Sequence, residues 1–204
     1  MLTGFKIFKY YIIQKKNPFV EMYFKGRKVL DIGCGRGGFL EKDPINFVGI
    51  DINKELIEIT KNKGLKAYLG DAANLPFPDN FFDGINCTNV IEHLYPEQAL
   101  KMLSEAKRVL RPGGFFLIST QLATNKIWRT FGHTRPYPPV AIEKILREDD
   151  DEGFGRLEGL EICQIFYLGE YYKNRFLRFI SKVLGFYTPI SRRGYVMILK
   201  KKKI

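Results

Sequence analysis

The feature that most constrains the fold is a glycine-rich turn that directly follows a short run of apolar and β-branched residues. The run is Lys28–Ile32, and Gly33, Gly35 and Gly38 follow it with the spacing G-x-G-x-x-G. Such a turn lets the backbone approach a ligand because no Cβ atoms stand in the way. The same spacing after a strand is typical of dinucleotide-binding folds, so the turn predicts a ligand site at the end of a buried strand.

Along the rest of the chain, strand-like and helix-like segments alternate. Strands separated by helices at this spacing form right-handed crossovers, which place the strands parallel in one sheet. Because the strand candidates are almost continuously apolar, both faces of that sheet should be covered. The expected fold class is therefore α/β, with a doubly wound Rossmann-like sheet. The expected strands are Lys28–Ile32, Asn46–Asp51, Lys66–Leu69, Phe82–Cys87, Phe115–Thr120, Leu160–Leu168 and Tyr195–Leu199.

The helix candidates have apolar residues on one face and recognisable ends. In the clearest of them, Pro96 suits a first helical turn, and Ala99 and Leu103 recur at helical spacing. The Pro-Gly-Gly sequence at residues 112–114 is expected to end this helix and to start the next strand. The expected helices are Asn53–Lys63, Pro96–Leu110, Pro138–Arg147 and Glu170–Leu184, with one more within Phe5–Tyr23.

Three strand candidates end in an aspartate or just before one, namely at Asp31, Asp51 and Asp71. In a doubly wound sheet, ligands bind beyond the carboxyl ends of the strands. A pyrophosphate placed beside Asp31 would be repelled in a partly buried cleft, whereas a cationic ligand without phosphate would be attracted. S-adenosylmethionine, which carries a sulfonium and an ammonium group, fits this pattern.

The three acids are expected to take separate roles toward that ligand. Asp31 would hold the ammonium end, directly or through water. Asp51 would accept hydrogen bonds from the ribose hydroxyls, and Asp71 from the adenine amine. Each aspartate alone would also suit a helix N-cap, and the glycine turn alone fits a nucleotide-dependent dehydrogenase equally well. Three acids in register favour the sulfonium ligand.

Around these residues the sequence resembles the class I S-adenosylmethionine-dependent methyltransferases, and within them the type 11, ubiquinone/menaquinone-methyltransferase-like group. The resemblance runs from Lys28 to Thr120. It rests on the segments VLDIGCGRGG, GIDIN, GDAANLPFPDNFFDGI, NVIEHL and RVLRPGGFFLIST. It implies a seven-stranded, mostly parallel sheet with a C-terminal antiparallel hairpin. It also implies S-adenosyl-L-methionine as the cofactor and S-adenosyl-L-homocysteine as the product.

The resemblance further assigns cofactor contacts motif by motif. The glycine turn contacts the methionine part, and the ends of the second and third strands flank the ribose and the adenine. The end of the fourth strand lies near the sulfonium or the amino-acid end. On this basis Cys34 is a small loop residue rather than a nucleophile. Together with Asp31, the expected cofactor-binding residues are Gly33, Cys34, Gly35, Asp51, Ile52, Asp71, Ala72, Cys87 and Thr88.

The sequence indicates the residues of the acceptor site less clearly than those of the cofactor site. Methyl transfer from a sulfonium mainly requires that the acceptor be aligned with the methyl group, and a general base is needed only if the acceptor must lose a proton. The acceptor-side candidates are His93, His133 and Tyr137. In some quinone-pathway O-methyltransferases, two acids and a histidine of this region hold a divalent metal. Here Asn89 replaces the first acid and leaves Glu92 with the histidine, so no metal is expected.

The net charge of +11 is carried by the two ends of the chain. Residues 1–28 hold seven Lys or Arg and one acid, residues 171–204 hold ten Lys or Arg and no acid, and the middle is mildly acidic. Basic ends favour an anionic partner such as RNA or a membrane surface, or are simply solvated. The leading interpretation is methylation of a small-molecule or lipid-like acceptor. The alternatives are RNA or protein methylation, and a non-catalytic S-adenosylmethionine-binding regulator.

A length of 204 residues favours a single domain. We divide it into a helical flank at residues 1–27, a cofactor-binding core at 28–120, and an acceptor-side and hairpin region at 121–204. The three cysteines form no CxxC pair, which disfavours disulfides and zinc and favours a reducing cytoplasm. No apolar run approaches the roughly 18 residues of a membrane-spanning helix.

Overall fold

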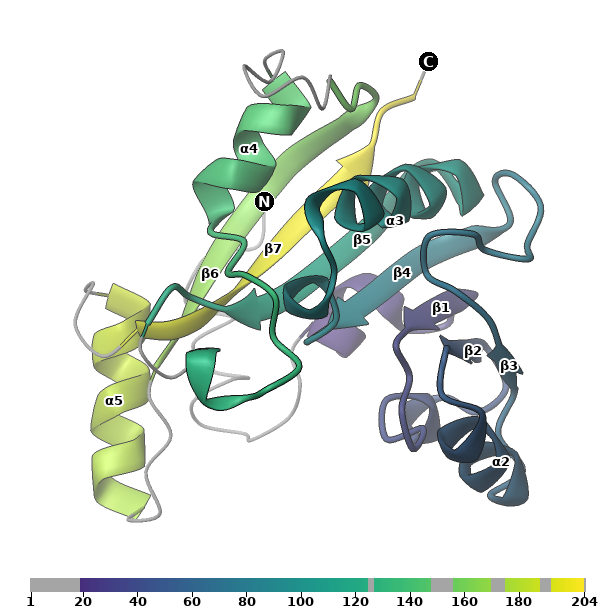
Figure 1. Cartoon of the computed structure of the whole chain (residues 1–204), viewed down its shortest axis with the longest axis horizontal. Helices are drawn as coiled ribbons and strands as arrows, with labels where there is room; N and C mark the ends of the chain where they lie inside the picture. Colours follow the sequence, from purple (N-terminus) through teal and green to yellow (C-terminus); the bar gives the residue numbers. More distant parts are fainter. Residues whose placement is uncertain (1–18, 125–126, 148–155, 170–174, 188–191, 204) are drawn as a thin grey trace.

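The computed structural model describes residues 19–124, 127–147, 156–169, 175–187 and 192–203. Within them the chain forms one seven-stranded sheet with the order β3-β2-β1-β4-β5-β7-β6 (Figure 1). The strands are β1 (Val29–Ile32), β2 (Phe47–Asp51), β3 (Ala67–Leu69), β4 (Phe82–Thr88), β5 (Leu110–Gln121), β6 (Leu160–Gly169) and β7 (Arg192–Lys201).

The strand pairing confirms the doubly wound fold that the sequence predicts. β1 pairs in parallel with β2 and β4, β2 pairs in parallel with β3, and β4 pairs in parallel with β5. β7 is antiparallel to both β5 and β6, which gives the expected antiparallel pair at the C-terminus. The chain runs from β1 to β2 and β3 and then returns to β4 on the other side of β1. The topological switch point therefore lies between β1 and β4.

The helices agree with the predicted segments to within a few residues wherever the structure describes them. Most of the predicted N-terminal helix and the start of the predicted helix Glu170–Leu184 lie outside the described residues. None of the described helices combines the length and the apolar character needed to cross a membrane. The helices are α2 (Lys54–Asn62), α3 (Pro96–Val109), α4 (Pro139–Arg147) and α5 (Arg175–Tyr187), with short turns η2 (Val20–Phe24), η3 (Leu40–Lys42), η4 (Ile91–His93) and η5 (Ile127–Arg129).

The end of α3 differs from the prediction. The Pro-Gly-Gly sequence does not terminate the helix, which already ends at Val109, and residues 112–114 lie inside β5. Opposite them the register shifts, because Leu110 pairs with Phe82 whereas Phe115 pairs with Gly84. The extra residues of β5 therefore bulge out of the ladder. Instead of the Pro-Gly-Gly sequence, the Lys201 ammonium closes the helix by donating to two of the last carbonyl groups, at 2.8 Å each.

Buried side chains cover both faces of the sheet, as parallel sheets require. Along β7, Tyr195, Met197 and Leu199 belong to the cluster that includes α3 and α4, whereas Val196 and Ile198 belong to the cluster that includes η2 and α2. This alternation is the period of two expected of a strand. α3 and α4 lie on the same face, in front of the sheet in Figure 1.

Candidate active site

A pocket of about 470 Å³ lies at the carboxyl ends of the first four strands. Its walls come from the glycine turn after β1, the end of β2, the loop after β3 and the segment after β4. Of the described residues that line it, two are aspartates and none is a lysine or arginine. A pocket with this charge attracts a cationic ligand and disfavours a phosphate.

The glycine turn is held in a conformation that other residues rarely adopt. Gly33 and Gly35 have φ angles of +71° and +52°, in the left-handed region. A Cβ atom at residue 33 would also collide with the side chain of Val90, across the pocket wall. The N–H groups of Gly33 and Cys34 both donate to the carbonyl of Ile50, at 2.8 and 3.1 Å. The turn is therefore fixed against β2.

Asp51 connects the glycine turn to the end of β2. Its Oδ2 atom accepts a hydrogen bond from the Gly35 N–H at 2.9 Å, and its Oδ1 atom accepts one from the Asn53 N–H at 2.9 Å. These two bonds orient the half-buried carboxylate in the pocket wall. Each carboxylate oxygen can accept more than one hydrogen bond, so the group keeps capacity for ribose hydroxyls.

The loop after β3 supplies the opposite rim. Asp71 is exposed and lines the pocket, with its Oδ1 atom accepting from the Ala73 N–H at 2.8 Å. Ala72 also lines the pocket and is half-buried. Ile52 lines it as well and is 74% exposed, which is unusual for so apolar a side chain. An apolar side chain beside an acid suits a flat, partly polar ring such as adenine.

Asp31 occupies a different position from the other two acids. Its side chain is only 4% exposed, and its Oδ1 atom accepts a hydrogen bond from the Asn86 amide at 2.6 Å. Burial raises the pKa of this carboxyl group from 3.8 to about 7. Asp31 does not line the pocket, so its contact with the ammonium group of the ligand stays a prediction.

The cysteines and the end of β4 also lie outside the lining. Cys34 and Cys87 are buried, and burial raises the pKa of both thiols, that of Cys34 to about 12. Neither thiol would be a thiolate near neutral pH, which agrees with the prediction that Cys34 is no nucleophile. Thr88 is exposed, and its hydroxyl contacts Asn86 at 3.4 Å. The cofactor contacts of Cys34, Gly35, Cys87 and Thr88 stay predictions.

Sequence reasoning considered Asn89 only as a substitute for a metal ligand, and it missed the lining residues Ile50, Asn53, Gly70, Val90 and Leu94. Asn89 has a φ angle of +55°, which asparagine tolerates better than most residues. It turns the chain away from β4, so that the following residues face the glycine turn. An asparagine two positions after a predicted strand was the available signal.

The two histidines come together although 40 positions separate them in the sequence. His93 lies in η4 and lines the pocket, whereas His133 follows η5. Their ring centroids are 4.7 Å apart, with the rings inclined at 73°. The sequence predicts both as acceptor-side residues, and the structure brings the pair to the rim of the cofactor pocket.

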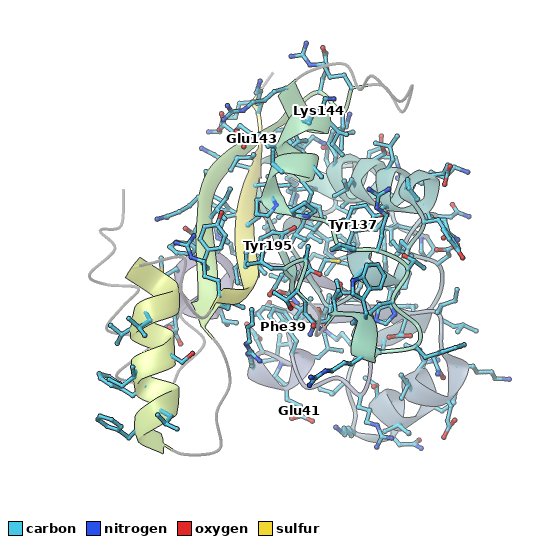
Figure 2. The ribbon with its side chains drawn as sticks, turned by 60° about the vertical axis from the view of Figure 1, so that its left-hand side comes forward. Phe39, Glu41, Tyr137, Glu143, Lys144 and Tyr195 are labelled. Atoms are coloured by element: carbon cyan, nitrogen blue, oxygen red, sulfur yellow. The ribbon has the colours of Figure 1, made fainter. Side chains whose placement is uncertain are left out.

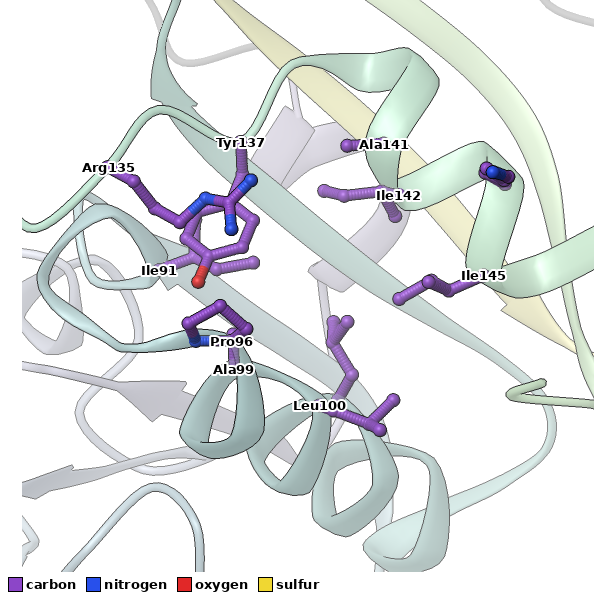
Figure 3. A pocket seen from close by; sticks show the side chains of 11 residues that line it. Ile91, Pro96, Ala99, Leu100, Arg135, Tyr137, Ala141, Ile142 and Ile145 are labelled. Carbon is purple, nitrogen blue, oxygen red and sulfur yellow. The ribbon is translucent and has the colours of Figure 1, made fainter. Parts of the chain in front are cut away.

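Tyr137, the third acceptor-side candidate, faces a separate cavity. This cavity of about 190 Å³ lies between α3 and α4 and is lined mainly by apolar side chains, with Leu100 and Ile145 far from the tyrosine ring (Figure 3). The Tyr137 hydroxyl donates to the Leu94 carbonyl at 2.9 Å. The buried Tyr195 hydroxyl donates to the Tyr137 carbonyl at 2.5 Å, and Figure 2 shows the two tyrosines near one another.

Glu92 is turned away from the pocket. Its side chain is fully buried, and its Oε2 atom accepts a hydrogen bond from the Thr120 hydroxyl at 2.8 Å. The Glu92 carbonyl accepts another from the Thr134 N–H at 2.8 Å. Within the part of the chain that the structure describes, no group of three His, Cys, Asp or Glu residues could hold a metal ion. Glu92 instead ties η4 to β5 and to the segment that follows His133.

Comparison with known proteins agrees with this geometry. Residues 30–118 match the family model described as a methyltransferase domain, in its type 11 form. A tRNA (carboxymethyluridine(34)-5-O)-methyltransferase from Arabidopsis thaliana is 39% identical over 111 residues, which cover 53% of this chain and 28% of that protein. A fatty-acid O-methyltransferase from Mycolicibacterium smegmatis is 42% identical over 103 residues, which cover 46% of this chain and 36% of that protein. The chain thus spans only a minor part of these relatives.

Solved structures share the whole fold. A SAM-dependent methyltransferase from Archaeoglobus fulgidus superposes on 98% of this chain, and over 100% of its own, with a TM-score of 0.70 at 24% identity. The cyclase SpnF superposes on 90% of this chain, and over 78% of its own, with a TM-score of 0.63 at 19% identity. Likeness at such identities shows the fold alone, and one fold hosts several reactions.

The doubly wound sheet and the acidic pocket at its switch point define a class I S-adenosylmethionine-dependent methyltransferase fold. The family-model match at residues 30–118 identifies one group within this class of methyltransferases. Residues 30–118 carry the methyltransferase domain of the type 11 group, and S-adenosylmethionine is the cofactor that this family uses.

Proposed function

We propose that the chain transfers the methyl group of S-adenosylmethionine to a small-molecule or lipid-like acceptor. When bound, the cofactor supplies a methyl group activated by the positive sulfonium. Asp51 would hold the ribose hydroxyls, and the glycine turn would leave room for the backbone to approach the amino-acid part. Ile52 and Asp71 would flank the adenine. The absence of Lys and Arg among the described lining residues fits a ligand that carries no phosphate.

One observation carries the choice of acceptor class. The cofactor pocket and the apolar cavity share η4 as a wall: Ile91 lines the cavity, whereas His93 lines the pocket. Tyr137, from the cavity, is bonded to the carbonyl of Leu94, which lines the pocket. An apolar acceptor would therefore find a compatible surface directly beside the methyl group. Buried apolar surface contributes roughly 25 cal/mol per Å² to such binding.

Two of the relatives act on apolar acceptors by name. One is the mycobacterial fatty-acid O-methyltransferase described above. Another is a phthiotriol/phenolphthiotriol dimycocerosates methyltransferase of Mycobacterium tuberculosis, 38% identical over 112 residues, which cover 50% of this chain and 40% of that protein. Both support a lipid-like acceptor. The tRNA methyltransferase and the basic ends of the chain favour RNA as the second candidate.

Radiolabelled methyl transfer into a fractionated lysate separates these candidates. We expect label in the small-molecule or lipid fraction, with a rate that changes little between low and high salt. Label in RNA with a steep loss of activity in salt would favour the second candidate, because phosphate contacts release counterions. Label in protein would overturn the proposed acceptor class. Tight S-adenosylhomocysteine binding with no label in any fraction would instead indicate a non-catalytic regulator.

A further inference from the structure

Each of the two histidines at the pocket rim is fixed by a backbone carbonyl. His93 Nδ1 lies 2.9 Å from the Gly132 carbonyl oxygen, and His133 Nδ1 lies 2.6 Å from the Ile127 carbonyl oxygen. A carbonyl oxygen only accepts hydrogen bonds, so Nδ1 must carry the proton in both rings. In the neutral imidazole the other nitrogen, Nε2, then keeps a free lone pair. The backbone thus sets both rings in the tautomer that exposes a basic Nε2.

The His93 ring lies at the pocket where the proposed reaction would occur. His93 is exposed and lines the cofactor pocket, whereas His133 is half-buried and packs against it edge to face. The segment that carries His93 is held firmly, because Glu92 bonds to Thr120 and Thr134 through its side chain and its carbonyl. His93 therefore has a fixed orientation at the wall that separates the cofactor pocket from the apolar cavity.

We propose that His93 is the general base of methyl transfer, and that His133 is a positioning residue that holds the His93 ring. This inference rests on the proposed function. It adds a substrate class: the acceptor presents a hydroxyl group, since a carboxylate acceptor is already ionised and needs no base.

In this step the acceptor oxygen attacks the methyl carbon, an O–CH₃ bond forms, and the S–CH₃ bond breaks. The electron pair of that bond stays on sulfur, which becomes a neutral thioether. The acceptor O–H bond breaks, and its proton passes to His93 Nε2 and then to water.

Several charged or titratable groups surround His93 in the described part of the chain. Asp51 and Asp71 line the same pocket, and the ring of His133 meets that of His93. Glu92 precedes it, with its carboxylate turned to Thr120. Arg135 lies on the segment beyond His133, with its guanidinium over the ring of Tyr137 at 5.3 Å.

The first test needs no acceptor and no activity. Nitrogen-15 NMR of the histidine-labelled wild-type chain reports which ring nitrogen carries the proton. We expect both neutral histidines as the Nδ1–H tautomer. An Nε2–H tautomer for His93 would overturn the proposal even if methyl transfer occurs, because Nε2 would then have no lone pair to accept a proton.

The second test uses the lysate fraction that takes up label. His93→Asn keeps an N–H donor near Nδ1 for the Gly132 carbonyl but removes Nε2. We expect the rate to fall by about 10²–10⁴-fold and the acidic limb of its pH profile to disappear. His133→Asn is the matched control, and it should retain that limb. A His93→Asn enzyme that keeps both its rate and its acidic limb would overturn the proposal.

The chemical stability of the labelled product gives a third readout. A methyl ether, formed on a hydroxyl acceptor, survives mild alkali, whereas a methyl ester, formed on a carboxylate, releases its label as methanol. Alkali-stable label is expected, and alkali-labile label would contradict the hydroxyl acceptor while leaving methyl transfer itself intact. No label in any fraction would instead count against the proposed function, and the NMR result would still decide the tautomer.

Discussion

The two halves of the molecule place their functional residues in different ways. In the cofactor half, residues 28–120, the site follows from backbone features: glycines with positive φ, aspartates at strand ends, and N–H groups that bond to them. The acceptor-side residues instead depend on packing between the two halves: His133 and Tyr137, from residues 121–203, contact His93 and Leu94, from residues 28–120.

The contrast fits the ligand that we propose for each half. A fixed cofactor demands the same backbone geometry in every member of a family, and the family model indeed covers residues 30–118 and ends before the acceptor half. The acceptor half combines exposed apolar side chains, Trp128 at 58% and Phe131 fully exposed, with the antiparallel pair β6–β7. Mutations of the glycine turn and of the strand-end aspartates should therefore act on cofactor affinity, whereas mutations of the acceptor-side residues, His93 included, should act on acceptor binding or turnover.

The largest expected effect comes from Gly33→Ala. Alanine at this position would have to adopt the left-handed backbone with a φ of +71°, which glycine tolerates, and its methyl group would collide with the Val90 side chain. The backbone strain and the collision each cost roughly 1–3 kcal/mol, so the affinity of the glycine turn for S-adenosylhomocysteine should fall by about 100-fold or more. Titration calorimetry measures this, and Gly64→Ala, another positive-φ glycine with open space around its Cβ position, is the control. Equal losses in both variants would contradict a site at the Gly33 turn.

Asp51→Ala should have the next largest effect on the cofactor half. It removes the carboxylate that we propose accepts hydrogen bonds from the ribose hydroxyls, and with it the bond from the Gly35 N–H. We expect a loss of roughly 1–3 kcal/mol in binding of S-adenosylhomocysteine, measured by calorimetry. Wild-type affinity in this variant would mean that the ribose does not lie at the end of β2. Asp43→Ala, which removes an acid from the loop before β2 and not from the pocket, serves as the comparison.

Asp31→Asn should change the pH dependence of stability. Burial raises the pKa of Asp31 from 3.8 to about 7, so the folded chain holds a proton that the unfolded chain releases. The stability contributed by this proton is complete below about pH 4 and is lost as the pH rises through 7, by at most about 1.4 kcal/mol per pH unit. The amide side chain of the variant cannot titrate, so the stability curve of Asp31→Asn should be flatter between about pH 4 and about pH 7.

Urea unfolding at several pH values in that window checks this expectation. The difference between Asp31→Asn and the wild type should grow in favour of the variant as the pH rises. Two parallel curves would mean that the Asp31 carboxyl group titrates in the folded chain as it does in the unfolded one.

The smallest expected effect is in the acceptor half. Ala141 lines the apolar cavity between α3 and α4, and the larger side chain of Ala141→Leu would fill part of that cavity. We expect the KM for the acceptor to rise by about three- to tenfold, while affinity for S-adenosylhomocysteine stays within about twofold. Val140→Leu, on the same helix but 67% exposed and outside the lining, is the matched control. A loss of cofactor affinity in Ala141→Leu alone would break the separation between the halves.

How far the sequence predicts the fold also differs between regions. The strand and helix segments of the parallel part follow from alternating patterns, because periodicity is a local property. The C-terminal antiparallel pair follows from the family resemblance, whereas the order of the strands is known only from the structure. The Pro-Gly-Gly segment misleads, because these residues usually break regular structure. In this chain they form a bulge of β5, and the Cβ position of Gly114 lies 2.9 Å from two backbone oxygens. That approach depends on β4, which a local pattern does not reveal.

The site divides in the same way. Asp51, Asp71 and the first glycine of the turn line one pocket, since strand ends in a parallel sheet meet at one edge, and their cofactor contacts stay predictions. The buried position of Asp31 depends on Asn86, which comes from the neighbouring strand. The pairing of His93 with His133 depends on how a segment after β5 folds back over η4. Single-sequence patterns carry no information about such contacts.

The cofactor assignment implies that the acidic pocket at the strand ends binds a cationic nucleoside without phosphate. Its most direct test is a calorimetric titration of the wild-type chain with S-adenosylmethionine, S-adenosylhomocysteine and NAD under identical conditions. We expect saturable binding of the first two and none of NAD, because Asp51 and Asp71 line the site without a lysine or arginine among the described lining residues. Saturable binding of NAD, with no heat from the sulfonium compound, would contradict the assignment.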